Sequence, residues 1–418
     1  MHSHVRRTTV EQLTVNGERL WSTLMETATF GGTPGGGISR LPLTDADKAV
    51  RDWFAAACTE LGCTVSVDNM GNMFALRKGR NTSLPPIAFG SHLDTQAGGG
   101  RFDGTLGVLA GLEVMRRLVE ADYATQAPLE LINWTAEEGG RFPPLFGSGV
   151  FVGAYELDWA YNSTDPDGIR FQDELERVGY RGDNAVSGHR LGAYFELHIE
   201  QGPILEAEDA AIGVVTGARG QLWYDGLISG TQGHAGTTPM SMRRDPMVTF
   251  TRIADATFRL AREYEPEGLA TIGHVELKPN SRNVVPGSVA FTVDLRHAKK
   301  TMLHRMDDEM VDHVGSVAAD SPTDVEFRRF WIVEPMEFDA RCVSAVRDAA
   351  EDLGYTHMDI VTGPGHDAVQ VAKFAPTAMI FVPCKDGVSH NEAESIEQVH
   401  ATAGANVLLQ SVLALAGV

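Results

Sequence analysis

Cysteine and positive charge are both scarce in this sequence. Its 418 residues include four cysteines, none of them in a C-x-x-C pair, which disfavours a cysteine zinc site and a disulfide framework. Lysine and arginine total 35 against 56 aspartate and glutamate residues, giving a formal net charge of −21. So acidic a chain is a poor partner for nucleic acid or an anionic membrane, and we expect neither.

Long apolar runs are missing as well. No stretch approaches the roughly 18 apolar residues that a membrane span needs. The N-terminal segment MHSHVRRTTV leads into a polar stretch without the apolar centre of a signal peptide. We therefore expect a cytoplasmic protein. The chain is 43% hydrophobic and longer than one compact domain usually is, so we expect two domains.

What the sequence does contain is an alternation of helices and strands. Helical spacing is found over residues 9–30, 44–61 and 105–121, and again over 394–415 at the end of the chain. Between them lie a hairpin, CTVSVDNMGNMFALRKG, and three short strands, PPIAFGSH, LELINWTAEEGG and YFELHIEQGP. This order predicts an α/β fold with a mixed sheet and helices on both of its faces.

Residues 214–332 have a different character. Strands dominate this segment, and two helices interrupt them near 245–263 and 300–318. A β-α-β-β-α-β order is typical of a small α+β domain of the ferredoxin-like type. We therefore predict a catalytic domain in two parts, residues 1–213 and 333–418, with a smaller domain inserted at 214–332.

Polar side chains gather where the predicted strands end, which is where α/β sheets bind their ligands. The pairs are His92 with Asp94, Glu137 with Glu138, and His198 with Glu200, while His390 lies in a further polar segment, SHNEAE. Burying several carboxylates together is costly unless a cation neutralises them. Histidine with carboxylate is a ligand set for zinc, or for manganese or cobalt in a more oxygen-rich site.

The stretch GSHLDTQAGGGRFDGTLGV shows how such a site could form. A strand holds His92, and Asp94 lies on the same face of the extended chain, where it could orient the His92 ring. The glycines at 98–100 would let the chain fold back so that Asp103 reaches the same metal. Asp103 also begins a predicted helix, where its charge suits a cap, and the alternative that it is only a cap stays open.

Seven motifs in this order resemble the hydantoinase/carbamoylase family of amidases. They are GSHLDT…GGRFDGTLGVLAGLEV, WTAEEGGRF, FELHIEQGP, GHAGTTPM, NVVPG…DLR, GPGHDA and SHNEAE. The family includes N-carbamoyl-L-amino acid hydrolases, β-ureidopropionase and allantoate amidohydrolase, and it belongs to the superfamily of dinuclear zinc peptidases and aminoacylases. The resemblance runs from about residue 20 to the C-terminus.

The resemblance implies two divalent metal ions per subunit, zinc or else manganese, cobalt or nickel. The implied ligands are His92, Asp103 and His198 for one ion and Asp103, Glu138 and His390 for the other, with Asp103 bridging. Glu137 is implied as the catalytic base. Most of the superfamily has an acid at the position of His198, so the histidine favours the carbamoylase and allantoate branch.

The resemblance also implies the residues that hold the substrate. His234 would stabilise the oxyanion, and Arg296, on the polar face of the predicted strand VAFTVDLR, would bind the substrate carboxylate. The implied helpers are Gln201, Asn283, Gly365 and His366. Without the motif, the position of Arg296 on an exposed strand face would indicate only an ordinary solvated charge.

We therefore expect a metal-dependent hydrolase that converts N-carbamoyl amino acids, α or β, to the amino acid, carbon dioxide and ammonia. Its small-molecule partner would be a ureido-acid substrate, and the resemblance to the family implies a homodimer formed through the inserted domain. The alternatives are an allantoate amidohydrolase, a di-zinc peptidase or aminoacylase, and a non-enzymatic ligand-binding protein. The last is disfavoured because a binding protein has no need of an unliganded acid such as Glu137.

Overall fold

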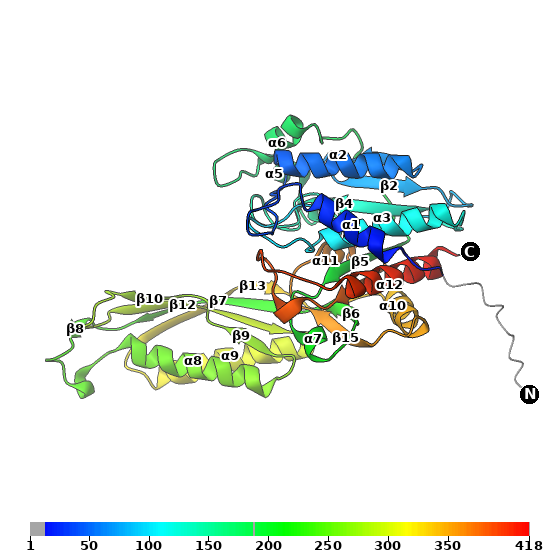
Figure 1. Ribbon diagram of the computed structural model, residues 1–418. Coiled ribbons are helices and arrows are strands. Elements are labelled where there is room, and N and C mark those ends of the chain that lie inside the picture. The colour runs from blue at the N-terminus through cyan, green and yellow to red at the C-terminus, as the bar shows by residue number, and fades with distance from the viewer. Residues whose placement is uncertain (1–12, 187–188, 418) are drawn as a thin grey trace, which may run out of the picture. The chain divides into compact units, whose positions relative to one another are not determined.

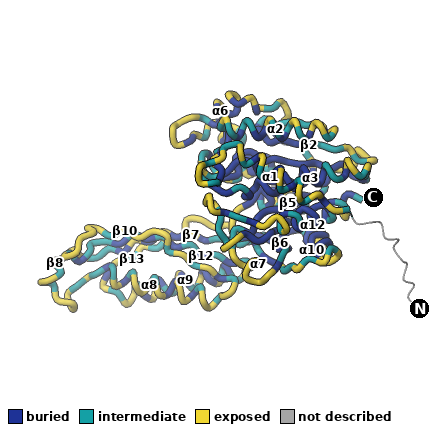
Figure 2. Tube along the Cα trace, viewed as in Figure 1, coloured by how far each residue is buried: buried dark blue, intermediate teal, exposed yellow. Residues whose placement is uncertain are grey.

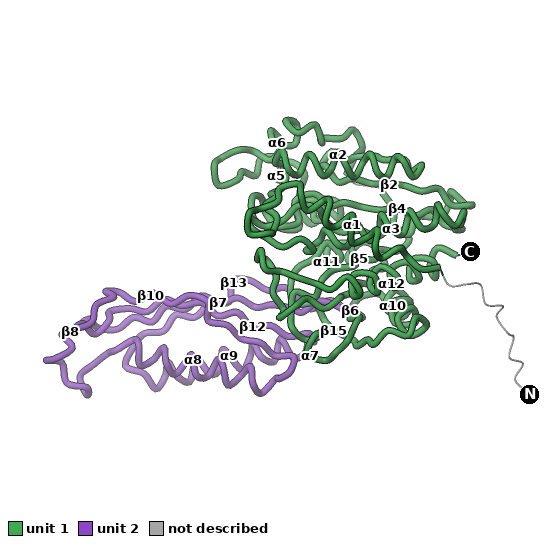
Figure 3. Tube along the Cα trace, in the orientation of Figure 1, with its two compact units in different colours: residues 1–216, 338–418 green, residues 217–337 purple. Residues whose placement is uncertain are grey.

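The computed structural model describes residues 13–186 and 189–417 (Figure 1). The chain divides into two compact units, the first formed by residues 1–216 and 338–418 and the second by residues 217–337 (Figure 3). The role of the second unit as a lid or dimerisation domain stays a prediction. Of the helix expected over 9–30, residues 9–12 lie outside the described part, and α1 covers Gly17–Thr27.

The larger sheet has nine strands and is mixed. Its order is β1-β2-β4-β3-β5-β16-β6-β14, and β15 pairs with β6. The bounds are β1 Thr64–Val67, β2 Met73–Arg77, β3 Ile87–His92, β4 Leu129–Trp134, β5 Ala193–Ile199, β6 Ile212–Ala218, β14 Met336–Glu337, β15 His357–Thr362 and β16 Thr377–Val382. β3 runs parallel to both of its neighbours, β4 and β5, and β16 runs parallel to β5.

Helices lie on both faces of this sheet, as predicted. Consecutive residues of a strand point to opposite faces, and in β5 the side chain of Leu197 lies against Gly404 of α12, while Glu196 accepts a hydrogen bond from Ala368 of α11. Besides α1, the helices of the first unit are α2 Asp45–Glu60, α3 Thr105–Glu120, α4 Phe146–Phe151, α5 Leu157–Asn162, α6 Phe171–Val178, α7 Ile204–Ala207, α10 Ala340–Asp352, α11 Asp367–Val371 and α12 Gln398–Ala416, with a 3-10 turn η2 at Lys385–Gly387.

The central strands of the sheet are buried along their whole length (Figure 2). Such continuous burial is typical of parallel strands covered on both faces. One helix in the described part of the chain, α12, is long and apolar enough to cross a membrane by length and composition alone. Most of it is buried, because it packs against α1, α3, α10 and the sheet, so it is a core helix of the first unit.

The second unit is built on a five-stranded antiparallel sheet. Its order is β10-β12-β7-β13, with β9 also pairing with β12. In β7 and β12 alternate residues are buried, and α8 and α9 pack with them around Tyr224, Phe291 and Leu295. The bounds are β7 Gly220–Ser229, α8 Pro246–Glu263, β9 Leu269–Thr271, β10 Val275–Lys278, β12 Ser288–His297, α9 Lys300–Ala319 and β13 Asp324–Val333. A two-stranded ribbon, β8 Gly233–His234 with β11 Val284–Val285, and a 3-10 turn η1 at Met240–Met242 complete it.

Candidate active site

The site is built at the carboxyl ends of three neighbouring parallel strands. His92 is the last residue of β3, and His198 lies one residue before the end of β5. After β4 the chain turns sharply at Ala136, whose φ of +56° lies in the left-handed region, and Glu137 and Glu138 follow. Because parallel strands end at one edge of a sheet, all of these side chains meet there.

The first cluster of potential metal ligands contains His92, Asp103 and His198. One side-chain donor atom from each lies within 4.8 Å of the others. The Nε2 atoms of His198 and His92 are 3.1 and 3.9 Å from Asp103 Oδ1. All three residues are buried. Asp103 does not cap α3, because the N-cap residue is Gly104 and no side chain caps that helix end. The alternative of a pure cap is therefore wrong.

The second cluster contains Asp103 again, with Glu138 and His390, and its donor atoms also lie within 4.8 Å of one another. His390 Nε2 is 3.4 Å from Asp103 Oδ2 and 3.6 Å from Glu138 Oε2. The two oxygens of Asp103 thus face different clusters, Oδ1 the first and Oδ2 the second. This is the arrangement that a carboxylate needs to connect two cations.

Main-chain carbonyls orient both buried histidines. His92 Nδ1 is 2.9 Å from the Asp94 carbonyl oxygen, and His198 Nδ1 is 2.8 Å from that of Ile199. A proton on Nδ1 leaves the Nε2 lone pair directed at Asp103, which is the tautomer that a metal ligand needs.

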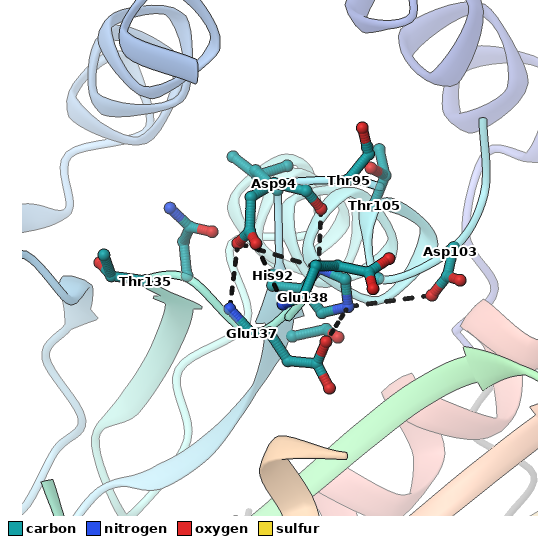
Figure 4. A network of polar contacts seen from close by, with 12 residues as sticks. His92, Asp94, Thr95, Asp103, Thr105, Thr135, Glu137 and Glu138 are labelled. Carbon is teal, nitrogen blue, oxygen red and sulfur yellow. Dashed lines mark hydrogen bonds and ion pairs between the residues drawn. The ribbon is translucent and has the colours of Figure 1, made fainter. Parts of the chain in front are cut away.

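Asp94 contacts the His92 ring through its main-chain carbonyl oxygen. Its carboxylate is 4.0 Å from His92 Nδ1. It accepts hydrogen bonds from the main-chain N–H groups of Glu137 and Glu138, at 3.4 and 3.1 Å (Figure 4). The main-chain oxygen and the carboxylate of Asp94 thus hold two different segments of the site. One residue therefore ties the end of β3 to the loop that follows β4.

Glu137 lies beside the first cluster but is a member of neither the first nor the second cluster. Its Oε2 is 3.5 Å from His92 Nε2. A pocket of about 330 Å³ opens in front of it, which is a volume suited to a small molecule. The lining includes the predicted residues Asp103, Glu137, Glu138, His198, Gln201, Gly365, His366 and His390. A pocket of about 410 Å³ elsewhere in the first unit contains no residue of either cluster.

Comparison with known proteins identifies the family. Residues 88–414 match peptidase family M20/M25/M40. The chain belongs to this family. This M20/M25/M40 protein is a hydrolase of amide-type C–N bonds, and its membership implies the use of divalent metal ions.

Individual relatives agree with the motif resemblance, which is thereby confirmed. The chain is 45% identical to an N-carbamoyl-L-amino-acid amidohydrolase of Rhizobium meliloti, over 96% of this chain and 97% of the relative. It is 33% identical to an allantoate amidohydrolase of Bacillus subtilis, covering 88% and 90% of the two chains. A hydantoinase/carbamoylase family amidase from Burkholderia multivorans has a crystal structure that matches with a TM-score of 0.94, at 50% identity over 97% and 98% of the chains.

The residues of this M20/M25/M40 site fit a cation. His92 Nε2 is buried without a hydrogen-bond partner in the described part of the chain, although an unpaired buried polar atom is costly. Burial lowers the pKa of His92 to about 4, which keeps its ring neutral. Burial, with the charge of Asp103 added, raises the pKa of Glu138 to about 8. Burial also raises the pKa of Glu137, and the charges of Asp367 and Glu138 add to the effect.

Burial also opposes the ionisation of Asp103, but the neighbouring rings of His198 and His390 hold the pKa of its carboxyl well below the usual value. Asp103 is therefore the ionised member of a group of acids that repel one another. A bound divalent cation would relieve that repulsion and occupy the buried Nε2 of His92.

Three residues at the site were not predicted. Gln96 donates to Glu138 Oε2 at 2.6 Å, and Gln201, a predicted substrate residue, donates to Asp103 Oδ2 at 2.8 Å. Glu394 accepts from the main-chain N–H groups of Phe102 and Asp103, and the Ser389 hydroxyl lies 3.1 Å from an oxygen of both Asp103 and Glu394, to either of which it can donate. Ser389 and Glu394 lie within the quoted motif SHNEAE, so the motif was the available signal.

The remaining predicted residues belong to the second unit. His234, in β8, is exposed, and its Nδ1 accepts from the N–H of Gly236 at 3.1 Å, so that Nε2 carries the proton. Asn283 directly precedes β11, the partner strand of β8, and its carbonyl accepts from Ala235. Arg296 is the last residue but one of β12, and its Nε and NH2 donate to Asp294.

Proposed function

We propose that this protein hydrolyses the carbamoyl C–N bond of N-carbamoyl amino acids, α or β, to the free amino acid, carbon dioxide and ammonia. The observation that carries the proposal is a pair of ligand clusters sharing Asp103, with a further acid, Glu137, beside them. The relative of 45% identity named as an N-carbamoyl-L-amino-acid amidohydrolase supports the choice of substrate.

We assign two divalent ions to the two clusters, zinc or else manganese, cobalt or nickel. His92 and His198 would hold one and Glu138 and His390 the other, with Asp103 between them. When bound, such ions lower the pKa of a water molecule toward neutrality and polarise the carbonyl that it attacks. The opposed directions of the two Asp103 oxygens support the bridging role.

Glu137 is the proposed general base. Its position outside the clusters leaves its carboxylate available for proton transfer, and its Oε2 lies at the pocket wall close to His92. It would accept a proton from the attacking water and return it to the leaving nitrogen. The main chain holds it firmly, because Leu145 donates to its carbonyl at 2.7 Å and Asp94 accepts from its N–H.

The substrate would lie in the pocket against Gln201, Gly365 and His366. His234 would donate its Nε2 proton to the developing oxyanion, which agrees with the tautomer set by Gly236. Arg296 would bind the substrate carboxylate with two parallel hydrogen bonds, and Asn283 would assist.

Strand length supports a homodimer. Ser288 and Arg296 lie eight residues apart in β12, which corresponds to about 27 Å of extended chain. The small ribbon with β8, which contains His234, lies beyond the Ser288 end of the sheet (Figure 1), and Asn283 directly precedes its second strand, β11. A small ureido acid cannot span that length, so we propose that each site takes Arg296 from one subunit and His234 with Asn283 from another.

Allantoate is the second candidate substrate, because it too carries a carboxylate and ureido groups, and relatives of 33% and 32% identity are named allantoate amidohydrolases. A peptidase or aminoacylase activity ranks lower because of His198, and a non-enzymatic ligand-binding role ranks lowest because of Glu137.

Release of ammonia from a panel of substrates tests the proposal. The panel contains N-carbamoyl-α-amino acids, N-carbamoyl-β-alanine and allantoate, and product assays for an N-acetyl amino acid and a dipeptide run beside it. We expect the highest kcat/KM on a carbamoyl amino acid. A higher value on allantoate would replace the proposed substrate, and turnover of only the acetyl or peptide compounds would overturn the carbamoylase assignment.

A further inference from the structure

Arg40 is a buried cation with an unusual set of partners. It is the last residue of the loop GGTPGGGISR, and it is 0% exposed. Its side-chain acceptors in the described part of the chain are three main-chain oxygens and one hydroxyl, with no carboxylate among them. They are Leu93 O at 2.6 Å, Thr27 O at 2.9 Å, Phe30 O at 3.0 Å and Thr105 Oγ1 at 3.1 Å. Buried arginines are normally paired with an acid, so this one calls for an explanation.

Two of these acceptors belong to the segments that carry the first ligand cluster. Leu93 lies directly after His92, and Thr105 lies two residues after Asp103, at the start of α3. One guanidinium therefore spans both segments. Its donors are fixed in a rigid plane, so the positions of the two acceptors are fixed relative to each other.

The main chain of Arg40 reinforces the same loop. Its N–H donates to Thr95 Oγ1 at 2.9 Å, and its carbonyl accepts from the N–H of Thr95, also at 2.9 Å. His92, whose Nδ1 depends on the Asp94 carbonyl, thus lies at the end of a short loop that Arg40 holds at both Leu93 and Thr95.

The glycines before Arg40 allow the loop to lie directly against the turn that leads to Asp103. The N–H of Ile38 donates to the carbonyl of Gly99 at 2.9 Å. At Gly37 a Cβ atom would lie only 2.3 Å from that same oxygen, so a larger residue would push the two segments apart. The loop therefore contacts the Asp103 segment on both sides, at Gly99 and at Thr105.

Arg40 also carries its charge near the buried Asp94. Burial lowers the pKa of Arg40 to about 10, while Asp47 and Asp94 act to raise it. The guanidinium thus remains protonated at neutral pH. Its positive charge acts on Asp94, whose carboxylate accepts from the main-chain N–H groups of Glu137 and Glu138.

We propose that Arg40 is a positioning residue for the metal site, which sets the separation of His92 and Asp103 through Leu93 and Thr105. The proposal rests on the assignment of those two residues as ligands. It makes the glycine-rich loop, which touches neither the pocket nor the reacting atoms, a determinant of metal affinity. Residues of this kind commonly change affinity or activity by about 10–100-fold when replaced.

The test measures zinc affinity by competition with a chelator, without substrate, in the full-length protein and in Arg40→Lys. Lysine keeps the charge but not the planar set of donors, so we expect zinc to bind about 10–100-fold more weakly. Arg19→Lys is the matched control, because Arg19 is tied to Glu113 away from both clusters. It is expected to lower the melting temperature without changing zinc affinity. Equal zinc affinity in Arg40→Lys and the parent would overturn the proposal.

A second variant covers the case in which Arg40→Lys does not fold. Thr105→Val removes only the hydroxyl that accepts from Arg40, and we expect a smaller but measurable loss of zinc affinity. Guanidinium well below its denaturing range should restore zinc binding in Arg40→Ala and should not affect Arg19→Ala. Unchanged affinity in Thr105→Val together with no rescue would overturn the positioning role. Failure of the parent protein to bind zinc, manganese or cobalt would instead overturn the metal site itself.

Discussion

The two units present their candidate functional residues in opposite ways. In the first unit, His92 and Asp103 have side chains only 1% and 5% exposed. His92 Nδ1 is hydrogen-bonded to the Asp94 carbonyl, and the main-chain N–H of Asp103 donates to Glu394. In the second unit, His234 is exposed and Arg296 is half-buried with a side chain 34% exposed. The first set is held in place by buried hydrogen bonds, whereas the second set lies open to solvent within its own unit. Metal binding should therefore depend on the first unit alone, and turnover on both.

Removal of metal should have the largest effect. We expect a chelator to abolish activity, because the clusters contain the proposed source of the activated water, and we expect zinc, manganese or cobalt to restore it. Activity and metal content are to be measured on the same samples. Full activity in a sample shown to be free of metal would contradict the proposed mechanism, and with it the distinction between the two units.

Glu137 and Glu138 test whether base and ligand are correctly distinguished within the first unit. Glu137→Gln should lower kcat by about 10²–10⁴-fold while two ions stay bound, because the amide is nearly isosteric but cannot accept the proton. Glu138→Gln should lose metal, chiefly from one cluster. The measurement is metal content beside kcat for both variants. If Glu137→Gln lost metal and kept its turnover per bound ion, the two roles would be reversed.

Much of the first unit could be predicted because its signals are local. Strands β3, β4 and β5 are short apolar runs with polar residues at or shortly after their ends, although β4 already ends at Trp134 and the chain turns at Ala136 before the two acids. Parallel pairing then brings His92, Glu137 and His198 to one edge without further information.

The contacts that orient these residues were less predictable, because they join segments far apart in the chain. Gln96 reaches Glu138 across 42 residues, and Glu394 reaches Asp103 across 291. Arg40 holds Thr105 across 65 residues. The sequence indicates only a glycine-rich loop at that position. Periodicity and motif spacing carry no information about which main-chain group such a side chain will meet.

His234 tests whether the second unit takes part in catalysis. His234→Ala should lower kcat by about 10²–10³-fold, the usual effect of losing one oxyanion donor, with metal content unchanged. Equal activity in the variant would remove His234 from the mechanism.

Mixing inactive subunits sharpens this test. If His234 acts on the site of another subunit, a mixed dimer of Glu137→Gln and His234→Ala chains contains one site with both native residues. Activity should then reappear when the two variants are exchanged into mixed dimers. If His234 acts within its own chain, every site lacks one of the two residues and no activity returns.

Arg296 is expected to give the smallest effect and the most specific one. Its Nε and NH2 already donate to Asp294, and Gln221 donates to the same carboxylate, so the guanidinium is held in one orientation on the polar face of β12. Charge-assisted hydrogen bonds contribute roughly 1.5–3 kcal/mol each, which is about 10–100-fold in kcat/KM. Arg296→Lys, which keeps the charge and loses the fork, should weaken kcat/KM by about tenfold, and Arg296→Leu by more.

The substrate rather than the protein supplies the control for Arg296. A carbamoyl amino acid and its amide differ only in the carboxylate, which the proposed clamp binds away from the metal ions so that it cannot chelate them. The parent protein should therefore prefer the acid, and Arg296→Leu should lose that preference because its kcat/KM falls on the acid alone. The comparison requires kcat/KM for both compounds in both proteins. If Arg296→Leu impairs the acid and the amide equally, the arginine is structural, and the argument that the substrate is recognised by its carboxylate fails with it.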